Sequence, residues 1–438
     1  MKIKIESTRI IKPIHEGIHQ IPKFPHSIPL SVFDKVTYNT HIAVIYAYRP
    51  PTPPNETIEY GLRRALSEYR EWGGRLGENE NGDLLILLND KGVKFVEATV
   101  DSKLDQLILL KPSPILLNLH PSLKDVEELV QVQLTRFACG SLVVGFTAHH
   151  LVADGHATSD FLVAWGKASR GLDIDPLPIH DRTIFSPRKP PSFEFEHRGV
   201  EFKSKNVIKD QFNYFDDRIF EDDISVHKVH FTLDFLSKLK ARASVSLENK
   251  SYSTFESLVA HLWRKITKAR GLGGFEKTHV RISVDGRMRM SPRIPNEYFG
   301  NLVLWAFPTA RVKDLLREPV SYAAKLIHDA IVNVNDSYFK SFIDFATYKV
   351  GKEDLTPTAE MNKSILCPNL EVDSWLRFPF YDLDFGGGCP YAFIPSYFPT
   401  EGMMFFLPSF IGDGSIDAFV PLFHDNLIIF KQIVYSLD

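Results

Sequence analysis

The sequence predicts two mixed α/β domains, and three observations support this fold class. The chain has 438 residues, which is more than one domain of ordinary size. Predicted strands and helices alternate irregularly and several strands form hairpin-like pairs, which argues against a doubly wound parallel sheet. A stretch rich in proline and charge separates the two halves. We therefore place an N-terminal domain at residues 1–185, a crossover linker at 186–215 and a C-terminal domain at 216–438.

The elements of the first half are predicted from hydrophobic alternation and periodicity. Strands are expected at residues 2–12, 40–48, 84–88, 130–134 and 142–147. The last two strands should form an antiparallel hairpin, since Gly140-Ser141 supplies a turn between them. A helix is predicted where apolar side chains share one face, at Ile58, Leu62, Ala65, Leu66 and Tyr69. A second helix is expected over residues 158–169.

The second half repeats this mixture of helices and strands. Ser253-Thr-Phe-Glu256 has the spacing of a capping box, which predicts the start of a helix. Strands are expected at residues 280–284, 302–307, 391–398, 403–410 and 416–423. The glycines at 386–388 are not followed by a lysine, so a phosphate-binding loop is not predicted.

Composition excludes several classes of protein. Lys and Arg number 51 against 54 Asp and Glu, so the basic excess of a nucleic-acid-binding surface is missing. The 3 cysteines have no CxxC spacing, which argues against a disulfide framework or zinc ribbon and favours a reducing compartment. Because neither a signal-peptide core nor an apolar run of roughly 18 residues is found, we expect a cytosolic location. The 33 phenylalanines either pack the core or line a pocket for a flat ligand.

The segment with the clearest chemical signature is His150-Leu-Val-Ala-Asp154-Gly155, which follows an apolar strand. A histidine at a strand end can act as a general base near neutral pH. Asp154 can orient the imidazole or brace the turn, and Gly155 permits a backbone bend that other residues resist. Taken alone, this spacing is common, and a structural histidine beside a turn aspartate is the more frequent explanation.

Two motifs are informative together, namely His150-x-x-x-Asp154-Gly155 and Asp384-Phe-Gly-Gly-Gly388. As a pair they resemble the motifs of the plant BAHD acyltransferases. Four further segments also fit that family, so the resemblance covers essentially the whole chain: Leu30-Ser-Val-Phe-Asp34, Ala260-His-Leu-Trp-Arg264, Val284-Asp-Gly-Arg287 and Tyr298-Phe-Gly-Asn301. One position departs from the pattern, because Gly387 stands where the family has a tryptophan. Because this motif is structural in the family, we expect the departure to change the packing around the turn rather than catalysis.

The resemblance implies an architecture and a co-substrate. We expect two chloramphenicol-acetyltransferase-like domains, each a mixed sheet with flanking helices, with an active-site tunnel at their interface. A segment near residues 370–392 should join the N-terminal domain. The resemblance further implies a monomer that uses a coenzyme A thioester as co-substrate, with no metal and no permanently bound cofactor. Neither a nucleic acid nor a membrane is expected as a partner.

The resemblance also assigns roles to single residues. His150 should take a proton from the acceptor, and the indole N–H of Trp375 should stabilise the oxyanion, unless Trp375 is a core aromatic bonded elsewhere. Five residues are expected to be structural: Asp154, Gly155, Asp384, Gly386 and Arg287, with Arg287 pairing to Asp384. His41 and Tyr46 match acyl-binding positions, although His41 could instead be a solvent-facing strand residue. Coenzyme A contacts are expected from Ser253, Thr254 and Arg289, although Ser253 could simply cap its helix.

The acceptor is predicted from charge. Shikimate and quinate transferases of this family place an arginine and a threonine where this chain has Glu360 and Asp373. Two carboxylates repel the carboxylate of shikimate, but they suit an ammonium or guanidinium group. Glu371 and Glu401 are expected to add to this acidic site. The alternative is that Glu360 is a solvated loop residue and only Asp373 faces the tunnel.

The sequence therefore predicts an N-hydroxycinnamoyltransferase. It would move a p-coumaroyl, caffeoyl or feruloyl group from coenzyme A to a primary amine of a cation such as putrescine or agmatine, giving a phenolamide. One alternative is an O-transferase for shikimate, quinate or another hydroxylated acceptor. A non-catalytic acyl-CoA-binding relative is the third hypothesis, which the intact His150 and Trp375 argue against. The physiological amine, the number of acylations and the preferred acyl group are left open.

Overall fold

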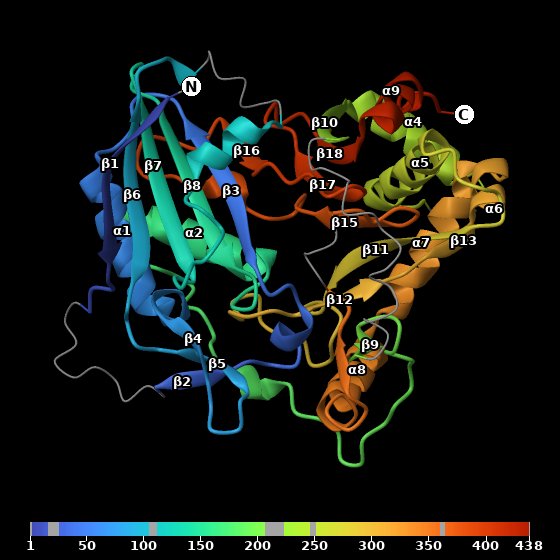
Figure 1. The fold of residues 1–438 in the computed structure, drawn as a ribbon, viewed down its shortest axis with the longest axis horizontal. Coiled ribbons are helices and arrows are strands. Elements are labelled where there is room, and N and C mark those ends of the chain that lie inside the picture. The colour runs from blue at the N-terminus through green and yellow to red at the C-terminus, as the bar shows by residue number, and fades with distance from the viewer. Residues whose placement is uncertain are drawn as a thin grey trace. The chain divides into compact units, whose positions relative to one another are not determined.

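The computed structural model describes residues 2–15, 26–104, 112–205, 223–245, 251–359 and 364–437. The chain divides into two compact units (Figure 1). The first consists of Met1–Ser186, Ile294–Leu302 and Arg377–Tyr397, and the second of Pro187–Arg293, Val303–Leu376 and Phe398–Asp438. The chain therefore returns to the first unit twice. The short return at Ile294–Leu302 has no counterpart in the sequence prediction.

The first unit is built on a six-stranded mixed sheet with the order β1-β6-β7-β8-β3-β16. Its strands are β1 (Ile3–Ile11), β3 (His41–Tyr48), β6 (Val93–Val100), β7 (Val130–Phe137), β8 (Leu142–His149) and β16 (Ala392–Pro395). A three-stranded sheet has the order β2-β5-β4, with β2 (Ser27–Pro29), β4 (Arg75–Glu78) and β5 (Leu84–Leu87). Within the larger sheet only β6 and β7 pair in parallel.

Two helices, α1 (Asn55–Glu68) and α2 (Gly155–Ser169), lie on one face of the six-stranded sheet (Figure 1). They pack against each other, and the indole of Trp165 donates to the carbonyl of Ile58 at 2.8 Å. Short 3-10 helices are η1 (Asp34–Val36), η2 (Arg70–Gly73), η4 (Pro114–Leu119), η5 (Arg182–Ile184) and η8 (Phe380–Asp382). The predicted β7–β8 hairpin is confirmed, and β8 is buried along its whole length because β7 and β3 flank it.

The second unit is built on a seven-stranded mixed sheet. Six strands follow the order β10-β18-β17-β15-β11-β12, and β13 pairs with β11. The strands are β10 (Ile224–Phe231), β11 (Lys277–Asp285), β12 (Val303–Ala306), β13 (Thr309–Arg311), β15 (Leu370–Ser374), β17 (Met403–Pro408) and β18 (Ile416–Phe423). β15 pairs in parallel with both β11 and β17. A two-stranded sheet joins β9 (Phe202–Ser204) to β14 (Leu355–Pro357).

In the second unit, α5 (Thr254–Ala269) packs against four helices, which are α4 (Leu233–Ala243), α6 (Val312–Arg317), α7 (Val320–Asn333) and α9 (His424–Ile433). A further helix, α8 (Asp336–Tyr348), follows α7. The predicted capping box is confirmed at the start of α5, with Ser253 as the N-cap and Glu256 bonded back to it. Mixed sheets with flanking helices in both units confirm the predicted fold class.

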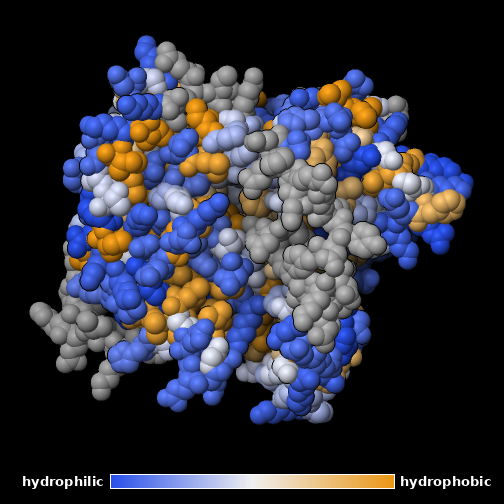
Figure 2. Space-filling model, in the orientation of Figure 1, coloured by the Kyte–Doolittle hydropathy of each residue, from blue (hydrophilic) through white to orange (hydrophobic). Residues whose placement is uncertain are grey.

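Most of the phenylalanines that the structure describes are buried, so the phenylalanine excess mainly packs the two cores. Figure 2 shows the apolar residues of one face as small patches among hydrophilic ones. Within the described ranges, every helix is too short or too polar to cross a bilayer.

Candidate active site

His150 lies at the end of β8, in the turn that leads into α2. β8 pairs with β3 up to His149, opposite His41, and the next N–H, of His150, donates to the carbonyl of Thr40 at 2.8 Å. The hydrogen bonds between β8 and β3 therefore fix the backbone position of His150. The side chain of His150 is only partly buried.

The imidazole of His150 contacts neighbouring side chains at its Nδ1 side. Its Nδ1 lies 3.3 Å from Oγ1 of Thr37, and the ring of Tyr38 stands edge-on at 6.0 Å. Among the described residues, Nε2 makes no hydrogen bond. Burial lowers the pKa of His150, while hydrogen bonding to its own backbone carbonyl and the carboxylate of Asp154 oppose that shift. A neutral imidazole with an unoccupied Nε2 has the properties of a general base at neutral pH.

Asp154 caps the helix that follows. One carboxylate oxygen accepts from the N–H of Ala157 at 2.9 Å, and the other accepts from the N–H of Leu302 at 3.0 Å. Asp154 is 2% exposed, so its carboxylate joins α2 to the returning segment Ile294–Leu302. These contacts are those of a structural residue. They also explain why α2 begins at Gly155, three residues before the predicted start.

Gly155 is required by packing rather than by backbone conformation. A Cβ on Gly155 would stand 2.6 Å from the ring of Phe378, which comes from the second returning segment. Only glycine lets this ring approach the start of α2. Phe378 also lies edge-on to His156 at 6.3 Å.

The second motif makes a tight turn around Asp384. Its carboxylate accepts from the N–H groups of Gly386 at 2.7 Å and Gly388 at 2.9 Å, and it lies 3.4 Å from the guanidinium of Arg170. The expected partner was Arg287, and this part of the prediction is wrong because Arg170, at the end of α2, takes that place. Arg287 is fully buried in the second unit and bonds to Asp285 at 3.2 Å.

Gly387 stands where the family motif has a tryptophan. A Cβ at Gly387 would collide with the carbonyl oxygen of Pro51, so this turn has no room for any larger residue. The departure from the family motif is therefore accommodated by a close approach between two backbone segments of the first unit.

The two predicted acyl-binding residues are buried on β3. His41 is 7% exposed and its Nε2 lies 2.8 Å from the carbonyl oxygen of Glu128, which excludes the solvent-facing alternative. Burial lowers the pKa of His41, so this imidazole is also neutral. Tyr46 is fully buried with its ring 4.8 Å from that of Phe393. Its hydroxyl makes no hydrogen bond with any described residue.

The four predicted acceptor-binding carboxylates have different surroundings. Glu401 is fully buried, lies 2.8 Å from the guanidinium of Arg270 and accepts from the N–H of Cys367. Glu401 is therefore not available to an acceptor, which corrects the prediction. Glu371 lies 3.7 Å from Arg281. Glu360 lies outside the described residues.

Asp373 differs from Glu371 and Glu401, because no described cation lies within ion-pair distance of it, although the more distant charge of Arg281 lowers its pKa. It lies on β15, two residues after Glu371 and therefore on the same face of the strand. Its carboxylate accepts a hydrogen bond from the hydroxyl of Ser283 on β11. Burial raises the pKa of Asp373 above its ordinary value. A cation bound beside it would favour the ionised form.

The remaining predicted residues also lie in the second unit. Trp375 follows β15, donates its backbone N–H to the carbonyl of Phe406 at 2.8 Å and packs 5.1 Å from the ring of Phe405. Arg289 donates to the carbonyl of Ile331 at 3.3 Å. Thr254 is the first residue of α5.

Ser253 is occupied by the capping box. Its hydroxyl accepts from the N–H of Glu256 and donates to the Glu256 carboxylate at 2.7 Å. The capping alternative therefore explains Ser253, and its hydroxyl is not available to coenzyme A.

Two residues that contact His150 had no role in the sequence prediction, namely Thr37 and Asn301. The amide of Asn301 donates to the carbonyl of His150 at 2.9 Å. Asn301 is the last residue of one family-like segment, and Asp34 is the last residue of another. Their membership in these two segments was the sequence signal that could have pointed to a role near His150. Thr37 belongs to none of these motifs, so no sequence signal pointed to it.

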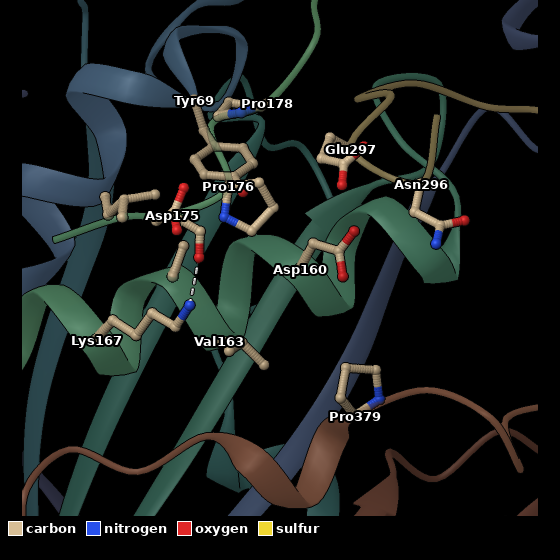
Figure 3. Close-up of a pocket in the computed structure, with 12 residues that line it drawn as sticks. Tyr69, Asp160, Val163, Lys167, Asp175, Pro176, Pro178, Asn296, Glu297 and Pro379 are labelled. Atoms are coloured by element: carbon tan, nitrogen blue, oxygen red, sulfur yellow. Dashed lines mark hydrogen bonds between the residues drawn. The ribbon is translucent and has the colours of Figure 1, made fainter. Parts of the chain in front are cut away.

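A separate hollow of about 160 Å³ lies in the first unit beside α2 (Figure 3). Tyr69, Asp160 and Glu297 line it together with several prolines, and Lys167 is tied to the carbonyl of Asp175 at 2.5 Å. None of the predicted site residues lines this hollow. Within the described part of the chain, no group of His, Cys, Asp and Glu side chains is arranged to hold a metal ion.

A family model described as the Transferase family matches residues 1–437. Agmatine hydroxycinnamoyltransferase 1 of Oryza sativa subsp. japonica is 51% identical over 445 residues, covering 100% of this chain and 99% of that protein. Putrescine hydroxycinnamoyltransferase 3 of the same subspecies is 50% identical over 442 residues, covering 100% of both. The crystal structure of vinorine synthase shares the fold, with a TM-score of 0.74, 22% identity, and coverage of 100% of this chain and 98% of that one.

Proposed function

This chain belongs to the BAHD family of acyltransferases, and we propose that it transfers a hydroxycinnamoyl group from coenzyme A to a primary amine of agmatine or putrescine. The observation that carries the proposal is the full-length similarity to two transferases named for these amines, at 51% and 50% identity. The carboxylate of Asp373, which has no described ion-pair partner, supports a cationic acceptor over a carboxylate such as shikimate. The cysteine pattern supports a cytosolic enzyme, and we expect a monomer.

The proposed reaction uses His150 as the base. The neutral amine nitrogen attacks the thioester carbonyl carbon, a C–N bond forms, and Nε2 of His150 takes the proton that this nitrogen loses. The tetrahedral oxyanion then collapses and the C–S bond breaks. The imidazolium returns its proton to the coenzyme A thiolate, so the enzyme ends in its starting state. Trp375 remains the predicted donor to the oxyanion.

Asp373 is the proposed anchor for the distal cation. Its carboxylate is held by Ser283 and has no described ion-pair partner. A guanidinium can bind a carboxylate through two parallel hydrogen bonds, and an ammonium binds it as a point charge. Glu371 lies close by on the same strand, and Glu360 remains a predicted contributor.

The test is a competition among acceptors. The purified protein is incubated with p-coumaroyl-CoA and an equimolar mixture of agmatine, putrescine, spermidine, tryptamine, tyramine and shikimate, and the products are identified by mass spectrometry. We expect the coumaroyl amide of agmatine or putrescine as the main product. A coumaroyl ester of shikimate as the main product, or no acylated product at all, would overturn the proposal.

A further inference from the structure

A buried threonine, Thr37, lies against the imidazole of His150. Thr37 is 8% exposed and directly follows η1, and its Oγ1 lies 3.3 Å from Nδ1 of His150. The two ring nitrogens therefore have different environments: the Thr37 hydroxyl lies beside Nδ1, the ring also bonds to its own backbone carbonyl, and Nε2 makes no hydrogen bond with a described residue. In a neutral imidazole, the partner of one nitrogen decides which nitrogen carries the proton.

The position of Thr37 is set by the turn that precedes it. Asp34 and Ser31 form a reciprocal pair, in which the N–H of Ser31 donates to the Asp34 carboxylate at 2.7 Å and the N–H of Asp34 donates to the Ser31 hydroxyl at 3.1 Å. The N–H of Thr37 then donates to the carbonyl of Asp34 at 3.4 Å. These hydrogen bonds fix the turn at Ser31–Asp34, and they thereby fix the position of Thr37, which follows it.

The same Asp34 carboxylate also holds the main chain around His150. The Asn301 amide donates both to Asp34 and to the carbonyl of His150, each at 2.9 Å. The guanidinium of Arg182 donates to Asp34 at 2.5 Å and to the carbonyl of Val152 at 2.7 Å. Asp34 is fully buried. One rigid carboxylate is thus the common reference for the Thr37 hydroxyl and for the backbone that carries the imidazole.

We propose that Thr37 is a positioning residue for His150: its hydroxyl oxygen accepts a hydrogen bond from Nδ1–H and so keeps the Nε2 lone pair free for the acceptor. This inference rests on the proposed function, because it needs His150 to act as the base. When Nε2 takes the proton of the amine, the ring becomes an imidazolium that keeps its Nδ1–H. The Thr37 oxygen stays a good acceptor for that group and stabilises the charged ring. The charged and titratable groups that act on the ring are Asp154, Asp34 and His149.

The test compares two substitutions that differ only in the hydroxyl. Thr37→Val keeps the shape of the side chain and removes the acceptor, whereas Thr37→Ser keeps the acceptor. We expect Thr37→Val to lower kcat about tenfold or more, since general-base catalysis as a whole contributes about 10²–10⁴-fold. The KM for p-coumaroyl-CoA and for agmatine should stay within about twofold, and Thr37→Ser should restore most of the rate.

A second readout is independent of turnover. Nitrogen-15 NMR of the histidine rings, with the His150 signals identified by comparison with His150→Gln, should show a proton on Nδ1 in the wild type and a mixture of tautomers in Thr37→Val. Thr135→Val is the matched control, because Thr135 is a fully buried threonine of β7 that accepts a hydrogen bond from Gln133. The control should leave kcat and the tautomer unchanged.

The outcomes separate the two proposals. A wild-type enzyme that does not acylate an amine contradicts the proposed function. An active wild type whose rate and Nδ1 signal are unchanged in Thr37→Val contradicts the positioning role alone. A loss of rate in Thr37→Val that Thr37→Ser shares, with no change of tautomer, would also contradict it.

Discussion

Two histidines of this protein, His150 and His197, show how similar chemical groups can serve different purposes. In the second unit, Nε2 of His197 lies 3.2 Å from the hydroxyl of Ser341, and Nδ1 lies 2.9 Å from the carboxylate of Glu201. This is the order of groups found in a Ser–His–acid triad. At the end of β8, His150 has a single side-chain partner on Nδ1 and none among the described residues on Nε2.

Burial and saturation distinguish the two arrangements. His197, Ser341 and Glu201 are all fully buried, and the Tyr338 hydroxyl donates to Glu201 at 2.7 Å. The Ser341 oxygen also accepts a hydrogen bond from the N–H of Phe195 at 3.2 Å, so it joins the chain segment around Phe195 to α8. With its hydrogen-bonding positions occupied and no access, this cluster stabilises the fold. His150 is only half-buried, and its Nε2 makes no hydrogen bond with a described residue, so this nitrogen can exchange a proton.

The largest effect is expected from His150→Ala. Loss of the base should lower kcat by about 10²–10⁴-fold, while the melting temperature stays near that of the wild type because the side chain is only partly buried. The assay follows release of the coenzyme A thiol from p-coumaroyl-CoA in the presence of agmatine. Turnover within threefold of the wild type would show that His150 is not the base.

A strong pH dependence is expected next. An alkylammonium has a pKa of about 10, so its neutral fraction rises about tenfold per pH unit below that value. Burial lowers the pKa of His150, so the base is already neutral throughout pH 7–9 and adds no further rise of its own. At agmatine concentrations far below KM, the rate should therefore increase steeply from pH 7 to pH 9. A flat profile over this window would contradict deprotonation of the amine as a requirement.

A smaller effect is expected from Asp373→Asn. Removing the carboxylate that lacks an ion-pair partner should raise the KM for agmatine about tenfold, which corresponds to about 1.4 kcal/mol, and should leave the KM for p-coumaroyl-CoA unchanged. Glu401→Gln is the matched control, because that carboxylate is already paired with Arg270. The control should reduce the melting temperature with little change in the KM for agmatine. Equal KM changes in both variants would contradict the assignment.

The smallest effect on turnover is expected from His197→Ala. Among the described residues, this substitution leaves the buried Glu201 with Tyr338 as its remaining hydrogen-bonding side chain, so the free energy of unfolding should fall by about 3 kcal/mol. Turnover per folded molecule should stay close to that of the wild type. Denaturant unfolding and active-site-normalised kinetics measure the two quantities separately. A loss of turnover as large as that of His150→Ala would break the comparison between the two histidines.

Local features of the fold were predictable from the sequence. The β7–β8 hairpin follows from alternation and a glycine turn, and the start of α5 follows from a capping box of four residues. α7 and α8 were not predicted, although both are amphipathic helices in the second unit. Residue chemistry alone did not distinguish His150 from a structural histidine at a strand end. The family resemblance was needed to predict that His150 is catalytic.

Ion pairs between distant segments were not predictable. Glu401 meets Arg270 across 131 residues, and Asp384 meets Arg170 across 214 residues. Sequence patterns report local periodicity, but they do not show which of many cations a returning segment will meet. The contact of Asn301 with His150 has the same origin, since it depends on the short return of Ile294–Leu302 to the first unit.

The most direct test of the account is chemical rescue of His150→Ala with free imidazole. If the missing group is a base, added imidazole should restore coumaroyl-agmatine formation in proportion to its concentration, and the restored rate should follow the neutral form of imidazole as the pH is varied. His197→Ala should not respond to imidazole. Full activity of His150→Ala without imidazole, or an equal response from both variants, would contradict the claim that His150 removes the proton of the acceptor.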